Sequence, residues 1–139
     1  MATETTLAII KPDAVAAGNT GAIIAHLERE GFEIVALKMV RLTEAQARAF
    51  YAVHRERPFY ESLVRFMTSG PVIPIVLRRE GAIAALREVM GATNPDAAAP
   101  GTVRKLYATD IEKNAIHGSD APETAAAEKP FFFSRLELD

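Results

Sequence analysis

Three apolar runs typical of strands alternate with segments whose apolar residues have helical spacing. The runs span residues 5–11, 32–42 and 72–77. Pro12 ends the first run because proline has no N–H to donate to a strand ladder. Both faces of the second run are largely apolar, which predicts a strand covered on both sides. Pro74 in the third run predicts an edge strand or an irregularity.

Helical spacing predicts five helices, three between these runs and two after them. The first four span residues 22–30, 43–54, 58–69 and 81–90. Thr43 and Gln46 form a capping box at the start of the second. The fifth starts with Asp120 as its cap and ends before Pro130, because the residue before proline avoids helical backbone angles. Residues 131–133 then form a short apolar strand or a docking segment.

The order of these elements predicts the fold class. Three or four strands interleaved with helices indicate an α/β (α+β) sandwich. Their count and order fit a ferredoxin-like split β-α-β plan, with helices covering an antiparallel sheet. The 139 residues are the ordinary size of one domain, so residues 1–139 are expected to form a single domain.

Composition narrows the classes of function. The chain has 49% hydrophobic residues, and no apolar run approaches the roughly 18 residues of a membrane helix. It lacks cysteine, which excludes thiolate chemistry, and its start does not resemble a signal peptide, so we expect a cytoplasmic protein. A net charge of −2 argues against a general nucleic-acid binder. It still allows a local cluster of cations around a phosphorylated ligand.

One long segment lacks a helix or strand pattern. Residues 92–102 are rich in small residues, and a long ordered loop in a compact domain usually has a function. Residues 103–111 are expected to be irregular as well. Cations stand on both sides of the loop, with Arg87 before it and Arg104 after it.

Residues 114–120 combine an imidazole, a hydroxyl, a carboxylate and an amide. Gly118 tolerates positive φ and would let the chain turn sharply after His117. For a His-Gly pair taken alone, a polar surface turn is the commoner explanation. Nine polar residues lie at predicted element ends, three of them in this stretch and six outside it: Lys11, Tyr51, Arg87, Thr93, Arg104, Asn114, His117, Ser119 and Glu128.

These residue types suit phosphate chemistry. Arginine forks match phosphate geometry, and lysine acts as a point charge. A neutral histidine is a nucleophile near pH 7, because its unperturbed pKa is about 6.5. One ring nitrogen of His117 must then be held by a partner, either Glu128 or a backbone carbonyl. The sequence has no Walker motif and no clustered metal ligands.

The stretch from Asn114 to Asp120 resembles the N-x-x-H-G-S-D signature of nucleoside diphosphate kinases. Further blocks resemble this family in order and spacing, over nearly the whole chain. These blocks are Leu7 to Asp13, Arg57 to Phe59, Ser69 to Val72, Met90 to Pro95, and Gly101 to Arg104.

The resemblance implies transfer of the γ-phosphoryl group of a nucleoside triphosphate, mainly ATP, to a nucleoside diphosphate. The route is a ping-pong mechanism through a phosphohistidine, and it maintains nucleoside triphosphate pools. By position, His117 would be the nucleophile, phosphorylated on its pros nitrogen (Nδ1), and Glu128 would orient it. Lys11 would contact phosphate and the ribose 3′-hydroxyl, and Tyr51 would line the same pocket.

The resemblance also assigns the remaining nucleotide contacts. Arg87, Thr93 and Arg104 would hold phosphates, Asn114 would bind the ribose, and Phe59 would stack on the base. Mg²⁺ would enter on the nucleotide phosphates, with no metal site formed by the protein itself. A homo-oligomer, either a hexamer or a tetramer, is expected, without a membrane or nucleic-acid partner.

Two other functions compete with this interpretation. A non-catalytic regulatory member of the family would have lost His117, Lys11 or Arg104, and all three are present. A sugar-phosphate or phosphatase-type enzyme would require an R-H-G element, which the sequence lacks. The chain departs from the family pattern at residues 78–81, 112–113, Ala121 and Lys129, none of which is an expected catalytic residue.

Overall fold

The computed structural model describes residues 2–138. Its strands are β1 (Thr3–Ile10), β2 (Glu33–Leu37), β3 (Ile73–Glu80) and β4 (Ile116–Gly118). Its α-helices are α1 (Pro12–Ala16), α2 (Thr20–Arg29), α3 (Glu44–Phe50), α4 (Tyr60–Met67), α5 (Ala82–Met90), α6 (Val103–Tyr107), α7 (Pro122–Phe132) and α8 (Arg135–Leu138). Two 3₁₀ helices are η1 (Ala52–His54) and η2 (Pro95–Ala97).

The strands form one antiparallel sheet in the order β2-β3-β1-β4. The two long strands, β1 and β3, lie in the middle, and Leu7 pairs with Val76. The short strand β4 pairs with β1, which places His117 beside Ile9. This architecture confirms the predicted ferredoxin-like plan.

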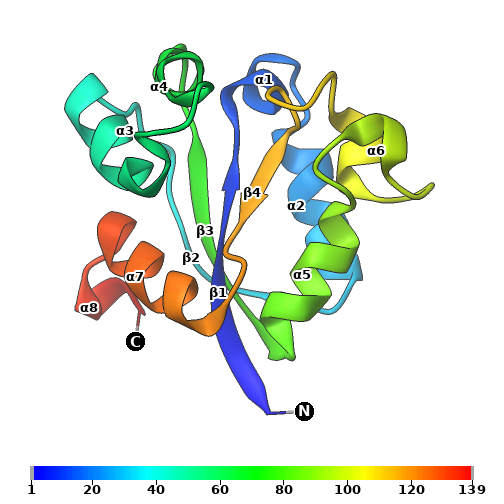
Figure 1. The fold of residues 1–139 in the computed structure, drawn as a ribbon. Helices are drawn as coiled ribbons and strands as arrows, with labels where there is room; N and C mark the ends of the chain where they lie inside the picture. The colour runs from blue at the N-terminus through cyan, green and yellow to red at the C-terminus, as the bar shows by residue number, and fades with distance from the viewer. Residues whose placement is uncertain (1, 139) are drawn as a thin grey trace.

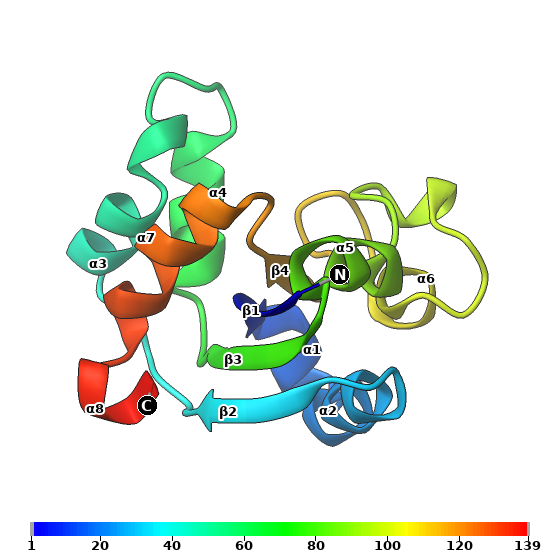
Figure 2. The same cartoon turned by 90° about the horizontal axis from the view of Figure 1, so that it is seen from below.

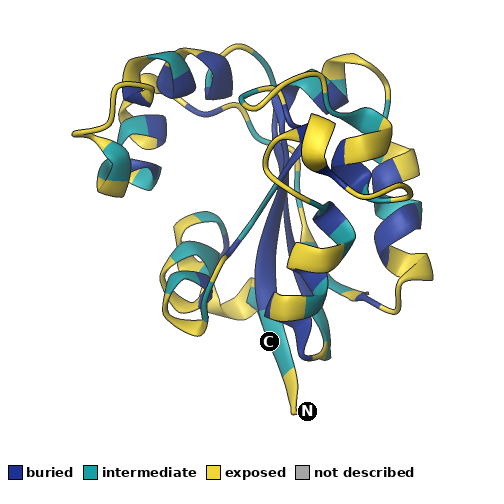
Figure 3. Ribbon diagram, turned by 45° about the vertical axis from the view of Figure 1, so that its right-hand side comes forward, coloured by how far each residue is buried: buried dark blue, intermediate teal, exposed yellow. Residues whose placement is uncertain are grey.

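Helices cover both faces of the sheet (Figures 1 and 2). Alternation along β1 supplies both cores, because successive side chains in a strand point to opposite faces. Ala8 and Ile10 join the core under α2, α5 and α6, whereas Leu7 and Ile9 join the core under α3 and α4. The buried strands consequently form the centre of the molecule (Figure 3).

The prediction of an edge position for Pro74 was wrong, because β3 is a central strand. An irregularity does interrupt the pairing of β3 with β2, but it lies away from Pro74, at the register shift between Ile34 and Ala36. Pairing of β2 with β3 ends regularly at Leu37 and Ile75, and Lys38 then donates to the Pro74 carbonyl at 3.3 Å. The Pro74 carbonyl faces β2, and an N–H at this residue would face the same way. The missing donor therefore leaves a gap only beyond the last regular pair of β2 and β3.

The second predicted strand is shorter and more open than expected. β2 lies at the edge of the sheet, and its last residue, Leu37, is 44% exposed. Beyond it, Met39 is also exposed, and Val40 forms an isolated bridge with Val72. The expected coverage of both faces is present in part, because Ile34 packs against one core and Val35 and Ala36 pack against the other, all three partly buried.

Two local predictions near the C-terminus were also wrong. Residues 103–107 form helix α6, which begins where the Thr102 hydroxyl accepts a hydrogen bond from the Lys105 N–H at 3.3 Å. Helix α7 continues through Pro130 to Phe132. Proline is tolerated there because it falls in the last turn, where it costs one intrahelical hydrogen bond. Of residues 131–133, Phe133 docks into the core, and none forms a strand.

The start of α7 likewise differs from the prediction. Ala121, rather than Asp120, is the cap residue. The Thr124 hydroxyl accepts hydrogen bonds from the N–H groups of Asp120 and Ala121, at 3.2 and 3.0 Å, and donates to the Asp120 carboxylate at 2.8 Å. The predicted capping box of Thr43 and Gln46 is confirmed at α3. No helix within residues 2–138 is long and apolar enough to cross a membrane.

Candidate active site

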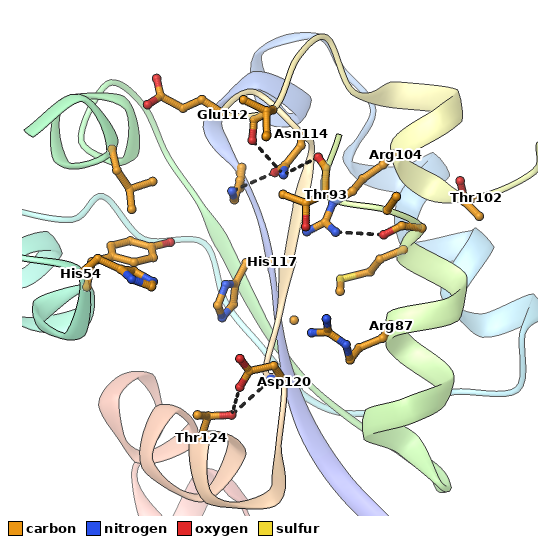
Figure 4. Close-up of a pocket in the computed structure, with 18 of the residues that line it drawn as sticks. His54, Arg87, Thr93, Thr102, Arg104, Glu112, Asn114, His117, Asp120 and Thr124 are labelled. Carbon is orange, nitrogen blue, oxygen red and sulfur yellow. Dashed lines mark hydrogen bonds between the residues drawn. The ribbon is translucent and has the colours of Figure 1, made fainter. Parts of the chain in front are cut away.

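A cleft of about 1010 Å³ lies over the end of β4 (Figure 4). Helices α3 and α4, with the residues between them, form one wall. The other wall consists of α5, the loop after it and the start of α6. The cleft brings together the nine residues named by the resemblance: Lys11, Tyr51, Phe59, Arg87, Thr93, Arg104, Asn114, His117 and Glu128.

His117 projects from β4 into this cleft, and its ring is fixed on several sides. The rings of Phe50 and Tyr51 meet it edge-on, with centroids 5.6 and 6.3 Å away. Nε2 lies 2.9 Å from Oε1 of Glu128, and the Ser119 hydroxyl donates to the same oxygen at 2.8 Å. Because an ionised carboxylate only accepts, Nε2 carries the proton and Nδ1 keeps a free lone pair.

The sharp turn beside His117 is not made by Gly118, contrary to the prediction. Gly118 lies within β4, and the residue with positive φ is Ala115, at +74°. The Ile116 N–H donates to the Asn114 carbonyl at 2.9 Å, which closes a γ-turn around Ala115. The backbone N–H of Ala115 donates to the Asp13 carboxylate at 3.1 Å, and its carbonyl accepts from the Lys11 N–H at 2.9 Å.

Gly118 is needed for close packing instead. A Cβ atom at this position would lie 2.8 Å from Cε of Met90 and 2.9 Å from Cδ2 of Leu86. Both side chains belong to α5 and are buried. The absence of a side chain therefore lets β4 lie directly against α5, which fixes the depth of His117 in the cleft.

Two buried cations line the cleft. Nζ of Lys11 donates to Oδ1 of Asn114 at 2.8 Å, and burial, followed by the nearby charge of Arg104, lowers the pKa of Lys11 to about 8. Arg104 donates to the carbonyls of Gly91 and Ile116, at 3.0 and 2.7 Å. Burial, followed by the charge of Arg87, lowers the pKa of Arg104 to about 10, which leaves it charged at neutral pH.

Asn114 connects three parts of the cleft wall. Besides accepting from Lys11, its amide nitrogen donates to the carbonyls of Thr93 and Ile111, at 3.2 and 3.1 Å. Arg87 and Thr93 are exposed toward solvent and remain accessible to a ligand. Tyr51 is buried with its hydroxyl unpaired, and burial, followed by the charge of Glu128, raises its pKa.

No group of three or more His, Cys, Asp or Glu side chains within residues 2–138 could hold a metal ion. Two of the carboxylates that line the cleft, the exposed Asp120 and the half-buried Glu112, lie far apart from each other. Asp120 lies beside His117, at the start of α7, and Glu112 lies toward the other end (Figure 4).

Sequence reasoning missed several lining residues. Ile111 is 63% exposed and Val53 is 84% exposed, which is unusual for side chains of this kind. His54 also lines the cleft, with its ring centroid 5.4 Å from that of Phe59. Ile111 could have been identified from its position beside Glu112 and Lys113. An apolar residue next to charged residues in a loop is unlike a core residue and is expected to be exposed.

Comparison with known proteins agrees with this geometry. A family model described as nucleoside diphosphate kinase matches residues 4–138. The chain is 60% identical to a nucleoside diphosphate kinase of Dinoroseobacter shibae and 55% identical to one of Persephonella marina, in both cases over 99% of each chain.

Solved structures give the same result. The structure of the Aquifex aeolicus nucleoside diphosphate kinase matches with a TM-score of 0.97 and 50% identity, over 99% of this chain and 100% of the other. A halophilic nucleoside diphosphate kinase from Halobacterium salinarum in complex with CDP matches with a TM-score of 0.94 and 40% identity, over 99% and 92%. The fold, the cleft and these relatives together establish that the chain belongs to the nucleoside diphosphate kinase family.

Proposed function

We propose that Nδ1 of His117 carries the phosphoryl group in this enzyme. The proposal is supported above all by the hydrogen bond between Nε2 and Glu128, which leaves the other ring nitrogen free. In the first half-reaction Nδ1 forms a bond to the γ-phosphorus, and the bond from that phosphorus to the β–γ bridging oxygen breaks, releasing a nucleoside diphosphate. In the second, a terminal oxygen of another nucleoside diphosphate attacks the same phosphorus, the bond from that phosphorus to Nδ1 breaks, and a nucleoside triphosphate leaves the restored His117.

Glu128 acts as the orienting partner. Its carboxylate keeps the proton on Nε2 and stabilises the ring as positive charge develops on it during attack. Ser119 shares the same carboxylate oxygen, which fixes the direction of that oxygen. The contacts of Phe50 and Tyr51 limit rotation of the imidazole. Catalysis then consists mainly of positioning and electrostatic stabilisation, as is general for phosphoryl transfer.

The phosphates bind among the cations of the cleft. Lys11, Arg87 and Arg104 supply positive charge, and the Thr93 hydroxyl can donate a hydrogen bond. Lys11 and Asn114 are bonded to each other, so both can reach the ribose hydroxyls and the phosphates from one place. Because one relative is solved with CDP, we expect a nucleoside diphosphate to occupy this cleft.

The base lies at the exposed end of the cleft, between Phe59 and Ile111. Both side chains are exposed and apolar, and both line the cleft. Stacking on an aromatic ring is tolerant of sequence because every base has a π-face. Broad acceptance of nucleoside diphosphates follows.

The donor set of the cleft fits Mg²⁺ that arrives with the nucleotide. Magnesium keeps several of its waters and is held by phosphates plus one or two carboxylates. Asp120 is placed to accept hydrogen bonds from such waters. When bound, the ion would neutralise charge on the transferring phosphoryl group. The cytoplasmic location and the homo-oligomeric state, a hexamer or a tetramer, remain predictions, and sedimentation would decide the latter.

The test is phosphohistidine formation. Incubation with γ-labelled ATP and Mg²⁺ should give a phosphoprotein that is labile to acid and stable to base, and added nucleoside diphosphate should discharge the label. His117→Ala should take up no label while still binding ADP. A folded wild-type protein that remains unlabelled would refute the proposal.

A further inference from the structure

The two walls of the cleft are joined by very few polar contacts. In the part of the chain that the structure describes, one hydrogen bond or ion pair connects residues 44–67 with residues 82–115. In it, the Ser62 hydroxyl donates to Oε1 of Glu112 at 3.1 Å. The two residues are 50 positions apart in the sequence, and the contact is partly buried.

On the Glu112 side the backbone is fixed. The Asp110 carboxylate accepts hydrogen bonds from the N–H groups of Glu112 and Lys113, at 3.0 and 2.8 Å. The Ile111 carbonyl accepts from the Asn114 amide at 3.1 Å. The loop is therefore anchored independently of the opposite wall, and the bond to Ser62 restrains the wall that α4 forms.

On the other side, Ser62 is one helical turn after Phe59. Residues three apart on a helix lie on the same face, so a restraint on Ser62 also restrains Phe59. Glu112 directly follows Ile111 along the chain. The bond thus links a residue on the same helix face as Phe59 with the residue that directly follows Ile111. Phe59 and Ile111 are the two apolar side chains that border the base end of the cleft.

Glu112 also lines two cavities. A second cavity of about 700 Å³ is bordered by α1 and α4, and Ser62 lines it. Among the described residues, only Glu112 lines both this cavity and the main cleft. The side chain that accepts the bond from Ser62 therefore belongs to the lining of both cavities.

We propose that Ser62 and Glu112 are positioning residues that hold Phe59 at stacking distance from Ile111 across the base. The Ser62 hydroxyl then contributes to affinity for the base. At the phosphate end, burial lowers the pKa of Lys11 and the charge of Glu112 raises it, so Ser62 is the residue that isolates the bond. This inference rests on the proposed function, because it requires a nucleotide whose base lies between these two side chains.

The experiment compares two probes on the full-length protein without phosphorylation. Calorimetry measures Kd for ADP, which has a base, and for inorganic tripolyphosphate, which has none. Ser62→Ala should raise Kd for ADP about threefold to tenfold, the size of one hydrogen bond, with tripolyphosphate unchanged within about twofold. Steady-state kinetics should show a higher KM at unchanged kcat.

Two matched variants guard against a general loss of stability. Ser62→Thr keeps a hydroxyl and should restore ADP affinity. Ser69→Ala removes a hydroxyl that bonds within its own chain segment, to the Phe66 carbonyl at 2.6 Å, and should change neither Kd. In a double-mutant cycle, adding Ser62→Ala to Glu112→Ala should cause no further loss of ADP affinity relative to tripolyphosphate.

Equal weakening of ADP and tripolyphosphate in Ser62→Ala would overturn the inference, as would unchanged ADP affinity or additive effects in the cycle. These results differ from failure of the proposed function, which appears as missing phosphohistidine in the wild-type protein.

Discussion

The two ends of the cleft are built in contrasting ways. At the proposed phosphate end, Lys11, Arg104, Asn114 and Ser119 are all buried, and each forms hydrogen bonds to other parts of the site. At the proposed base end, Phe59 and Ile111 are 44% and 63% exposed, and their walls share a single hydrogen bond among the described residues.

The difference matches the demands of the reaction. Phosphoryl transfer depends on atoms held near 3 Å, and small displacements cost large factors in rate. Stacking requires only a flat surface at the right separation, so it tolerates movement and different bases. If this comparison is correct, substitutions at the two ends should change different kinetic parameters.

The largest effect is expected for Lys11→Met. Loss of the ammonium removes a charge from the phosphate end, and kcat/KM should fall about 10²–10³-fold, a typical loss for one electrostatic contact to a transition state. A coupled assay with ADP measures it. Lys105→Met, at an exposed position on α6, changes net charge equally and serves as the control. A loss below about tenfold for Lys11→Met would contradict a rigid, charge-dependent phosphate end.

The pH dependence should show the same lysine. Since its pKa in the free enzyme is about 8, kcat/KM should fall about tenfold per pH unit above that value, as the charged form is lost. Bound phosphate favours the charged form, so the fall in kcat should occur at higher pH. A kcat/KM profile flat to pH 10 would contradict the assignment.

The contribution of Lys11 to the free energy of unfolding should rise over the pH range in which kcat/KM falls. Between pH 8 and the ordinary pKa of 10.5, the unfolded chain binds more protons at Lys11 than the folded chain does. The contribution of Lys11 to the free energy of unfolding therefore rises with pH across this window. The difference between wild type and Lys11→Met in urea unfolding, followed against pH, isolates it.

Phe59→Ala tests the base end. Removal of the ring should weaken nucleotide binding by about 1–3 kcal/mol, seen as a higher KM with nearly unchanged kcat. The melting temperature should change little, because the ring is partly exposed. A large fall in kcat at saturating nucleotide would show that the two ends are not separable in this way.

Gly118→Ala should lower stability by about 1–3 kcal/mol, because the new methyl group meets Met90 and Leu86 in a packed core. Urea unfolding measures the change. Gly21→Ala is the matched control, since Gly21 lies in helix α2, where a methyl group would meet no atom within 4 Å and alanine favours the helix. Equal stability of the two variants would show that β4 can move away from α5.

The smallest effect is expected for Lys129→Met. Nζ of Lys129 on α7 donates to the Thr5 hydroxyl on β1 at 2.6 Å, a partly buried contact. Its loss should reduce the free energy of unfolding by about 1 kcal/mol. The kcat should remain within about twofold, because Glu128 keeps its own bonds to His117 and Ser119. A tenfold fall in kcat would mean that this contact positions Glu128.

Much of the fold could be predicted from local patterns, and the failures have physical causes. The capping box at Thr43 and the buried strand β1 depend on neighbouring residues alone, so the sequence identified them. The edge position of β2 depends on which strands pair, which periodicity does not encode. Pro130 was misjudged because its cost in the last helical turn is small beside the packing of Phe133.

In the site, too, some features could be predicted from the sequence and others depend on contacts formed only after folding. His117 and its surrounding cations could be named because their residue types suit phosphate chemistry and their spacing resembles the family. The positive φ of Ala115 could not, since alanine carries no signal for left-handed backbone. Ser62 and Glu112 were also missed, because a contact between residues 50 positions apart is visible only after folding.

The γ-turn at Ala115 depends on contacts with the N-terminal segment of the chain. A non-glycine residue in this conformation is strained by about 1–2 kcal/mol, so it requires external restraint. That restraint comes from Lys11 and Asp13, and the Asp13–Ala115 bond spans 102 positions of the chain. A nascent chain synthesised only as far as β3 contains Lys11 and Asp13 without Ala115, and a fragment lacking residues 1–13 contains Ala115 without Lys11 and Asp13. Neither piece alone can therefore hold the turn that leads into His117.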